Sequence, residues 1–319
     1  MMDRAIVLGA PRSGTSFLMS VLDGLPAAEC VSGNLLPVGI AHLAAQPLSE
    51  EMREALERSF RVALADYLTS GAYNARSAAL RKWWAVGHPP AGLLTAARGK
   101  RVQSMLVYKE PFLAFAPELP YRALANAPIL YIFRDGRDVA DSLVRSYDVL
   151  SDRKLADLES NEVHMGRRVG DRYVPWWVAN GEEDAFLGIS PYLRALWMWR
   201  EMVRRCERIL SQDEVERSRR VLRVRYEDLM RTPLEQGKRL TTHLGLTPTR
   251  ASRRRLGEAH ERSIGIYRNR ERDEIDAAER LAGEELTMLG YTLRTPAAGA
   301  HPATATAPGA REAVVRESR

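Results

Sequence analysis

Cysteine is scarce in this chain, and long apolar runs are absent. The 319 residues include two cysteines, Cys30 and Cys206, and neither lies in a CxxC or Cys/His spacing. This excludes a disulfide-rich scaffold and predicts no metal site. The apolar run at 5–10 is far too short for a membrane span, and the N-terminus lacks the layout of a signal peptide. We therefore expect a soluble cytoplasmic protein that binds no metal and no membrane.

Acidic residues are outnumbered by basic ones, which gives a net charge of +6 and an isoelectric point near 9.4. This balance favours an anionic ligand. The arginine-rich stretches at 217–225 and 250–262 alternate with apolar or acidic residues, as exposed faces of helices and strands do. We therefore expect no nucleic-acid partner.

Short apolar runs recur between long helical patterns. They lie at 5–9, 104–109, 129–133 and 221–226. Nearly continuous apolar strands separated by helices are typical of a parallel sheet covered on both faces. The sequence thus predicts an α/β fold of three layers, with a central parallel sheet flanked by helices.

Composition also suggests the domain boundaries. Helical patterns recur up to the end of the sequence expected to be ordered, at 192–210, 233–245 and 273–289, and we expect a single domain over 1–294. The segment 151–191 is weakly periodic and predicts an insertion or lid over an acceptor site. The residues 295–319 carry few groups that anchor a core, so we expect a disordered tail.

The stretch AIVLGAPRSGTS at 5–16 runs from a strand into a glycine-bearing turn. It nearly matches a phosphate-binding loop, GxxxxGK[ST], but Thr15 stands where that loop has lysine. Backbone N–H groups at the start of a helix bind anions with or without lysine. Arg12, three residues earlier, therefore predicts a phosphorylated ligand held from the front of the loop; an ordinary strand-turn-helix connection is the alternative.

A second strand runs into a helix in YIFRDGRDVADSLVRSY. Arg134 ends the strand, and Ser142 lies about two helical turns later. An arginine and a hydroxyl at the edge of a sheet can hold a second phosphate. Two such sites on neighbouring strands predict a ligand that is phosphorylated at both ends.

Four motifs together resemble the PAPS-dependent sulfotransferase family, whose donor is 3′-phosphoadenosine 5′-phosphosulfate. They are PRSGTS, RDGRDVADS, VRYEDL and SIGIYRNR, and in order and spacing they cover residues 5–294. The resemblance implies the P-loop-like fold of that family. It also implies PAPS as co-substrate and a small-molecule acceptor.

The resemblance assigns roles residue by residue. In that family the first loop binds the 5′-phosphosulfate, and the second motif binds the 3′-phosphate, here Arg134 and Ser142. Tyr226 matches a residue near the adenine, although a tyrosine at the edge of the sheet is an equal alternative. The first loop corresponds to Arg12, Ser13, Gly14, Thr15 and Ser16, and the segment that closes over the nucleotide corresponds to Tyr267, Arg268, Asn269 and Arg270.

The implied reaction is in-line transfer of a sulfuryl group to a hydroxyl or amine, without a metal. A natural-product or other small, partly apolar acceptor suits this prediction. Arg12 would stabilise the charge that develops on the bridging oxygen. Lys109 resembles a lysine that the family sometimes places beside the leaving group.

The general base is where this sequence departs from the family pattern. Relatives often carry a glutamate near the position of 32–34, which here reads Ser-Gly-Asn. Glu110 and His42 are the main substitutes, with Glu29 as a third, and each has a structural alternative. The pairs Trp83–Trp84 and Trp176–Trp177 are candidates for the wall of the acceptor pocket.

Two rival functions stay open. A nucleotide or small-molecule kinase of P-loop type would use Asp135 to bind magnesium, but the missing lysine and the adjacent Arg134 disfavour it. A non-catalytic relative that binds the nucleotide would explain the missing glutamate.

Overall fold

A five-stranded parallel sheet forms the centre of the protein, in the order β2-β3-β1-β4-β7. The computed structural model describes residues 3–33, 39–69, 80, 82–84, 104–157 and 166–294. The four predicted strands are confirmed, and β2 is an additional strand at the edge of the sheet. The strands are β1 (Asp3–Leu8), β2 (Ala28–Ser32), β3 (Met105–Lys109), β4 (Ile129–Phe133) and β7 (Val221–Arg225).

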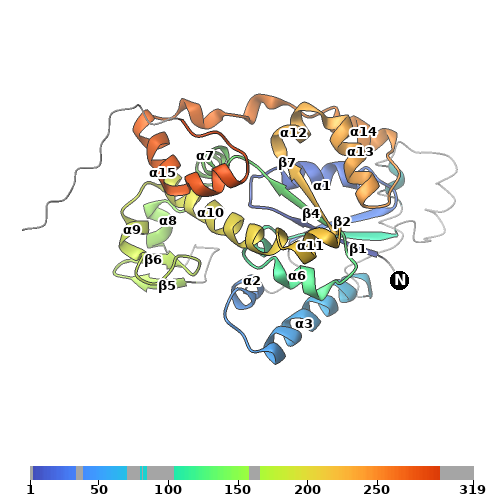
Figure 1. Cartoon of the computed structure of the whole chain (residues 1–319), viewed down its shortest axis with the longest axis horizontal. Helices are drawn as coiled ribbons and strands as arrows, with labels where there is room; N and C mark the ends of the chain where they lie inside the picture. The colour runs from blue at the N-terminus through green and yellow to red at the C-terminus, as the bar shows by residue number, and fades with distance from the viewer. Residues whose placement is uncertain are drawn as a thin grey trace, which may run out of the picture.

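Side chains of each central strand alternate between two hydrophobic clusters, one on each face of the sheet. In β1, Ile6 and Leu8 belong to one cluster, and Ala5 and Val7 to the other. The first cluster is covered by α3 (Glu50–Thr69), α6 (Glu118–Ala123), α7 (Gly136–Tyr147), α10 (Pro191–Leu210) and α15 (Arg272–Met288). The second is covered by α1 (Thr15–Asp23), α12 (Tyr226–Arg231), α13 (Pro233–His243) and α14 (Arg250–Leu256). Figure 1 shows α10 crossing the middle of the molecule and α12, α13 and α14 gathered at the upper right, so the predicted three-layer α/β fold is confirmed.

The segment 151–191 forms a small unit of its own below α10 and α15 in Figure 1. It contains α8 (Asp152–Ala156), a two-stranded antiparallel hairpin of β5 (Gly166–Val169) and β6 (Arg172–Pro175), and α9 (Glu183–Leu187). Residues 158–165 and the predicted tail at 295–319 lie outside the described residues. The other short elements are α2 (Ile40–Ala44), α11 (Asp213–Arg217), and the 3-10 turns η1 (Pro111–Phe115), η2 (Glu261–Ser263) and η3 (Ile266–Asn269).

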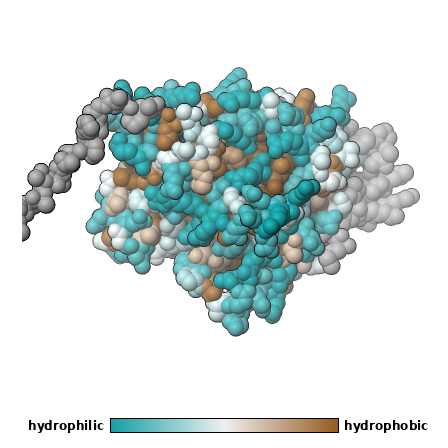
Figure 2. Space-filling model, in the orientation of Figure 1, coloured by the Kyte–Doolittle hydropathy of each residue, from teal (hydrophilic) through white to brown (hydrophobic). Residues whose placement is uncertain are grey.

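The surface viewed in Figure 2 is mostly hydrophilic, and its hydrophobic residues lie in small separate patches. None of the helices in the described ranges combines the length and the apolar character that a membrane span needs. The same ranges contain no group of three or more His, Cys, Asp or Glu side chains placed to hold a metal ion.

Candidate nucleotide and acceptor site

A cavity of about 740 Å³ opens at the carboxyl ends of the central strands. Because these strands are parallel, the segments that follow β1, β3, β4 and β7 all reach the same edge of the sheet. Of the predicted site residues, eight line this cavity: Arg12, Gly14, Thr15, Ser16, Lys109, Arg134, Ser142 and Tyr226. The two predicted anion-binding groups therefore face one cavity.

The first loop turns sharply between β1 and α1. Gly14 has φ 93°, and a Cβ at this position would overlap Cδ2 of Tyr226 and lie 2.9 Å from its Cε2. Gly14 also caps α1 without a side-chain hydrogen bond to the first turn. The first-turn N–H groups of α1 thus face the cavity without a side-chain acceptor, which is the arrangement that binds anions.

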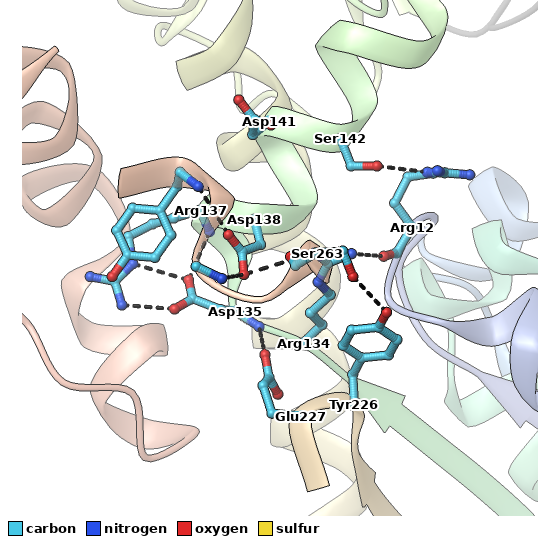
Figure 3. Close-up of polar contacts among 12 residues, drawn as sticks. Arg12, Arg134, Asp135, Arg137, Asp138, Asp141, Ser142, Tyr226, Glu227 and Ser263 are labelled. Atoms are coloured by element: carbon cyan, nitrogen blue, oxygen red, sulfur yellow. Dashed lines mark hydrogen bonds and ion pairs between the residues drawn. The ribbon is translucent and has the colours of Figure 1, made fainter. Parts of the chain in front are cut away.

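Arg12 joins the first loop to α7. Its Nε donates a hydrogen bond of 2.9 Å to Oγ of Ser142 (Figure 3). Its guanidinium lies 5.4 Å from the ring centre of Tyr147. Arg12 has φ 68°, a left-handed conformation that is uncommon outside glycine. The loop therefore holds this side chain toward the serine of the second motif.

Arg134 is buried, with 4% of its surface exposed, yet its side chain lines the cavity. It donates to the backbone oxygen of Arg12 at 3.2 Å and to that of Ser263. Its guanidinium stacks 4.6 Å from the ring centre of Tyr226, whose hydroxyl shares a hydrogen bond of 2.8 Å with Oγ of Ser263. Figure 3 shows these groups converging at the end of β4.

Ser13 does not lie where it was expected. Its side chain is fully buried and faces a small internal space beside Tyr131 and Trp199. Its N–H donates to the backbone oxygen of Ala10 at 3.1 Å, which closes the turn. Neither group is therefore available to a ligand in the main cavity.

The C-terminal segment reaches the cavity through residues other than those predicted. His260, Ser263 and Ile266 line the cavity, whereas Tyr267, Arg268, Asn269 and Arg270 do not. Tyr267 is buried against the guanidinium of Arg137, at 4.2 Å from its ring centre. Arg268 and Asn269 are exposed.

Arg270 is held away from the cavity by its own partners. It donates to Asp141 at 2.9 Å and to Glu274 at 2.8 Å, and it stacks 3.9 Å from the ring centre of Tyr192. A contact between Arg270 and a ligand in the cavity would require these interactions to break.

The predicted catalytic side chains outside the first loop, Lys109, Glu110 and His42, do not lie together in one site. Lys109 lines the cavity, and its Nζ donates to Oγ of Ser16 at 3.4 Å. Glu110 instead caps η1 by accepting from the N–H of Phe112 at 3.2 Å, and it does not line the cavity. His42 in α2 stacks 4.7 Å from the ring centre of Trp176, and it too lies outside the cavity lining.

Burial shifts the pKa of each of these three groups. It lowers the pKa of Lys109 and raises the pKa of Glu110, and the ion-pair attraction between the two opposes both shifts. It also lowers the pKa of His42. A lysine with a lowered pKa gives up its proton more readily, so Lys109 is the group of the three with both the position and the chemistry to act on a ligand.

The lining of the cavity also includes apolar side chains. Among them are Phe112 from η1, Leu150 and Leu155 around α8, Trp177 after β6, and Met198 from α10. Of the two predicted tryptophan pairs, Trp177 alone lines the cavity, while Trp84 is exposed. The cavity lining thus combines cationic groups with apolar side chains.

Among the lining residues that sequence reasoning missed are Phe17, Tyr147 and Ser263. Phe17 lies in the first turn of α1, three residues after Gly14, so its place beside the loop follows from helical spacing. Tyr147 ends α7, five residues after Ser142. For Ser263 the local sequence gave no such spacing.

Comparisons with known proteins identify the family and the fold. The sequence profile of the sulfotransferase family matches residues 5–190, which include both phosphate-site motifs. No curated protein sequence matches the chain. The sulfotransferase domain from the olefin synthase of Synechococcus PCC 7002 has a similar structure, with 17% identity, a TM-score of 0.50, and coverage of 92% of this chain and 96% of that chain.

Two further solved structures are similar at a lower score. A sulfotransferase domain from the curacin biosynthetic pathway is 18% identical, with a TM-score of 0.47 and coverage of 92% of this chain and 99% of that chain. A sulfotransferase from Mycobacterium avium is 16% identical, with a TM-score of 0.44 and coverage of 92% of this chain and 78% of that chain.

Proposed function

The chain belongs to the sulfotransferase family, and from this membership we propose that it transfers a sulfuryl group from PAPS to a hydroxyl or amine of a small-molecule acceptor. One observation carries the proposal: Arg12, Arg134 and Ser142 line a single cavity at the carboxyl ends of the strands. Its volume of about 740 Å³ lies within the range of small-molecule sites, about 300–1,000 Å³.

The residues present suit a nucleotide with phosphates at both ends. The N-terminus of α1 and Arg12 would hold the 5′-phosphosulfate, and Arg134 and Ser142 the 3′-phosphate. A phosphate bound beside Ser142 would replace its hydrogen bond from Arg12. The rings of Phe17 and Tyr226 line the same cavity and offer apolar surface to a nucleotide base.

When bound, PAPS supplies the sulfuryl group, and the task of the protein is to stabilise the charge left on the departing phosphate. Arg12 and the N–H groups of α1 do this as fixed positive groups. Lys109, whose pKa is lowered by burial, can add a proton or a hydrogen bond there. The acceptor would bind against apolar side chains of the cavity lining such as Phe112 and Trp177.

The setting of the reaction is proposed from the composition of the chain and from its likeness to a solved structure. The similar domain from an olefin synthase belongs to a biosynthetic enzyme, so we propose tailoring of a natural product. The sparse cysteines favour a cytoplasmic enzyme. We further propose that the segment 151–191, which contributes Lys154, Leu155 and Trp177 to the lining, covers the acceptor.

Binding and transfer experiments test the proposal in turn. Calorimetry should show saturable binding of adenosine 3′,5′-bisphosphate without a divalent ion. Transfer of ³⁵S from labelled PAPS into metabolite extracts of the source cell should then label a product and identify the acceptor. Magnesium-dependent binding of ATP with no binding of the bisphosphate would favour the kinase alternative, and binding without transfer to any acceptor would favour a non-catalytic relative.

A further inference from the structure

The segment 260–270 contributes three residues to the cavity although it contains only two short 3-10 turns, η2 and η3. Gly265, between the turns, has φ 77°. Short turns of this kind have little stability of their own. The position of Ser263 in the site must therefore be set by contacts with other elements.

Asp138, in the first turn of α7, supplies the central contact. Its side chain is 1% exposed, and its two oxygens accept the N–H groups of Gly265 at 2.7 Å and Tyr267 at 3.1 Å. One of these oxygens lies 3.8 Å from NH2 of Arg134. Figure 3 shows the carboxylate between the C-terminal segment and Arg134.

We propose that Asp138 is a positioning residue for nucleotide binding: it fixes the segment 260–270 and the guanidinium of Arg134 relative to one another. Asp138 does not line the cavity, so it acts through Arg134 and Ser263. Arg134 in turn donates to the backbone oxygen of Ser263, which closes the arrangement. This inference rests on the proposed function, because its ligand is the nucleotide.

Removal of the charge on Asp138 has two opposite consequences. A carboxylate beside Arg134 lowers the positive potential at a phosphate site, so its neutralisation alone would strengthen the binding of an anion. An amide in its place can accept only one of the two N–H groups and turns its own N–H₂ toward the other. If Asp138 acts by positioning, the second effect is the larger one and the nucleotide binds more weakly.

Asp141 provides a matched control. It lies one turn further along α7, is also buried, and also accepts from the C-terminal segment, through Arg270 at 2.9 Å. Neither Asp141 nor Arg270 lines the cavity. Asp141 also accepts from Arg145 at 2.8 Å, and this arginine lines the cavity with a mostly exposed side chain. Asp141→Asn therefore removes a comparable charge and a comparable contact without touching Gly265 or Tyr267.

The test is calorimetric titration of wild type, Asp138→Asn and Asp141→Asn with adenosine 3′,5′-bisphosphate, with hydrogen exchange of the Gly265 and Tyr267 amides as a local readout. We expect Asp138→Asn to weaken binding about tenfold and to speed exchange at both amides, because hydrogen bonds to a charged group are lost. We expect Asp141→Asn to stay within about twofold of wild type.

Equal or tighter binding by Asp138→Asn would overturn the inference while leaving the proposed function intact. No binding by the wild type would instead refute the proposed function. If Asp138→Asn does not fold, Gly265→Ala strains the same segment at φ 77° with the carboxylate in place. It should weaken binding several-fold, and wild-type affinity in that variant would also overturn the inference.

Discussion

Gly14→Ala should damage both the stability of the protein and its binding site. Gly14 lies at the N-cap of α1 with φ 93° and ψ 7°. An added Cβ would overlap the ring of Tyr226 and lie 3.3 Å from Cδ1 of Ile132. Tyr226 cannot move away freely, because its hydroxyl is bonded to Ser263 and Arg134 lies over its ring.

The expected loss has two parts. A left-handed conformation costs an L-residue about 1–2 kcal/mol, and forcing a methyl group into a packed position costs about 1–3 kcal/mol more. Together they predict a fall of about 2–5 kcal/mol in the free energy of unfolding. Since the displaced ring is part of the cavity wall, affinity for adenosine 3′,5′-bisphosphate should fall as well.

Gly170→Ala isolates the contact with Tyr226. Gly170 has φ 61°, and a Cβ there would meet nothing within 4 Å. In Gly170→Ala the free energy of unfolding should therefore fall only by the cost of the left-handed conformation, about 1–2 kcal/mol, and the nucleotide affinity should be kept. Denaturant unfolding measures the stability of Gly14→Ala and Gly170→Ala, and calorimetry measures their nucleotide affinity. Tyr226→Ala should partly rescue stability in the Gly14→Ala background. Equal losses in the two single variants, or the absence of rescue, would refute the proposed packing of the loop.

Three further predictions concern charged residues. Arg12→Ala should chiefly lower kcat, and Arg134→Ala should chiefly raise the Kd for adenosine 3′,5′-bisphosphate. The same changes in kcat and Kd in both variants would contradict separate roles in transfer and in nucleotide binding. Glu110→Gln should keep kcat at saturating acceptor within about twofold of the wild-type value, because this carboxylate caps η1. A loss of kcat beyond tenfold would restore Glu110 as a candidate base. Burial raises the pKa of Asp138 from 3.8 to about 6, with Asp135 adding to the shift and Arg134 and the Gly265 and Tyr267 N–H groups opposing it. The protonated Asp138 therefore stabilises the folded protein fully below about pH 4, and this contribution is lost as the pH rises through 6. Relative to wild type, the free energy of unfolding of Asp138→Asn should gain up to about 3 kcal/mol between pH 4 and pH 7. A difference between the two proteins that does not depend on pH would argue against a buried, ionised Asp138.

Local sequence signals predicted most of the fold. The runs that become β1, β3 and β4 are nearly all apolar because both faces of these strands are buried. The edge strand β7 was still recognised from its valines and leucine, although Arg223 and Arg225 interrupt them and only Val224 is buried. The strand β2 escaped prediction because Glu29 interrupts its short apolar pattern at the edge of the sheet. That carboxyl side chain is nevertheless buried, which no pattern in the surrounding sequence indicates.

The site was predictable where a strand leads directly into a helix. In that setting the sequence fixes the position of the turn, so Arg12, Arg134 and Ser142 could be placed at one edge of the sheet. The C-terminal segment offers no such constraint. It turns at Gly265, which has a left-handed conformation, and Ser263 lines the cavity. Arg270 instead donates to the carboxylates of Asp141 and Glu274, outside the cavity lining.

Lys109 and Glu110 show why adjacency in sequence does not imply a shared site. Side chains of a strand alternate between faces, and at the end of β3 it is Lys109 that faces the cavity. The next residue, Glu110, leaves the strand and uses its carboxylate to begin η1. The end of β3 therefore offers the site a cation rather than a base. Under the proposed function, this cation suits stabilisation of the departing phosphate. A group that accepts the proton of the acceptor would then come from another element of the cavity wall.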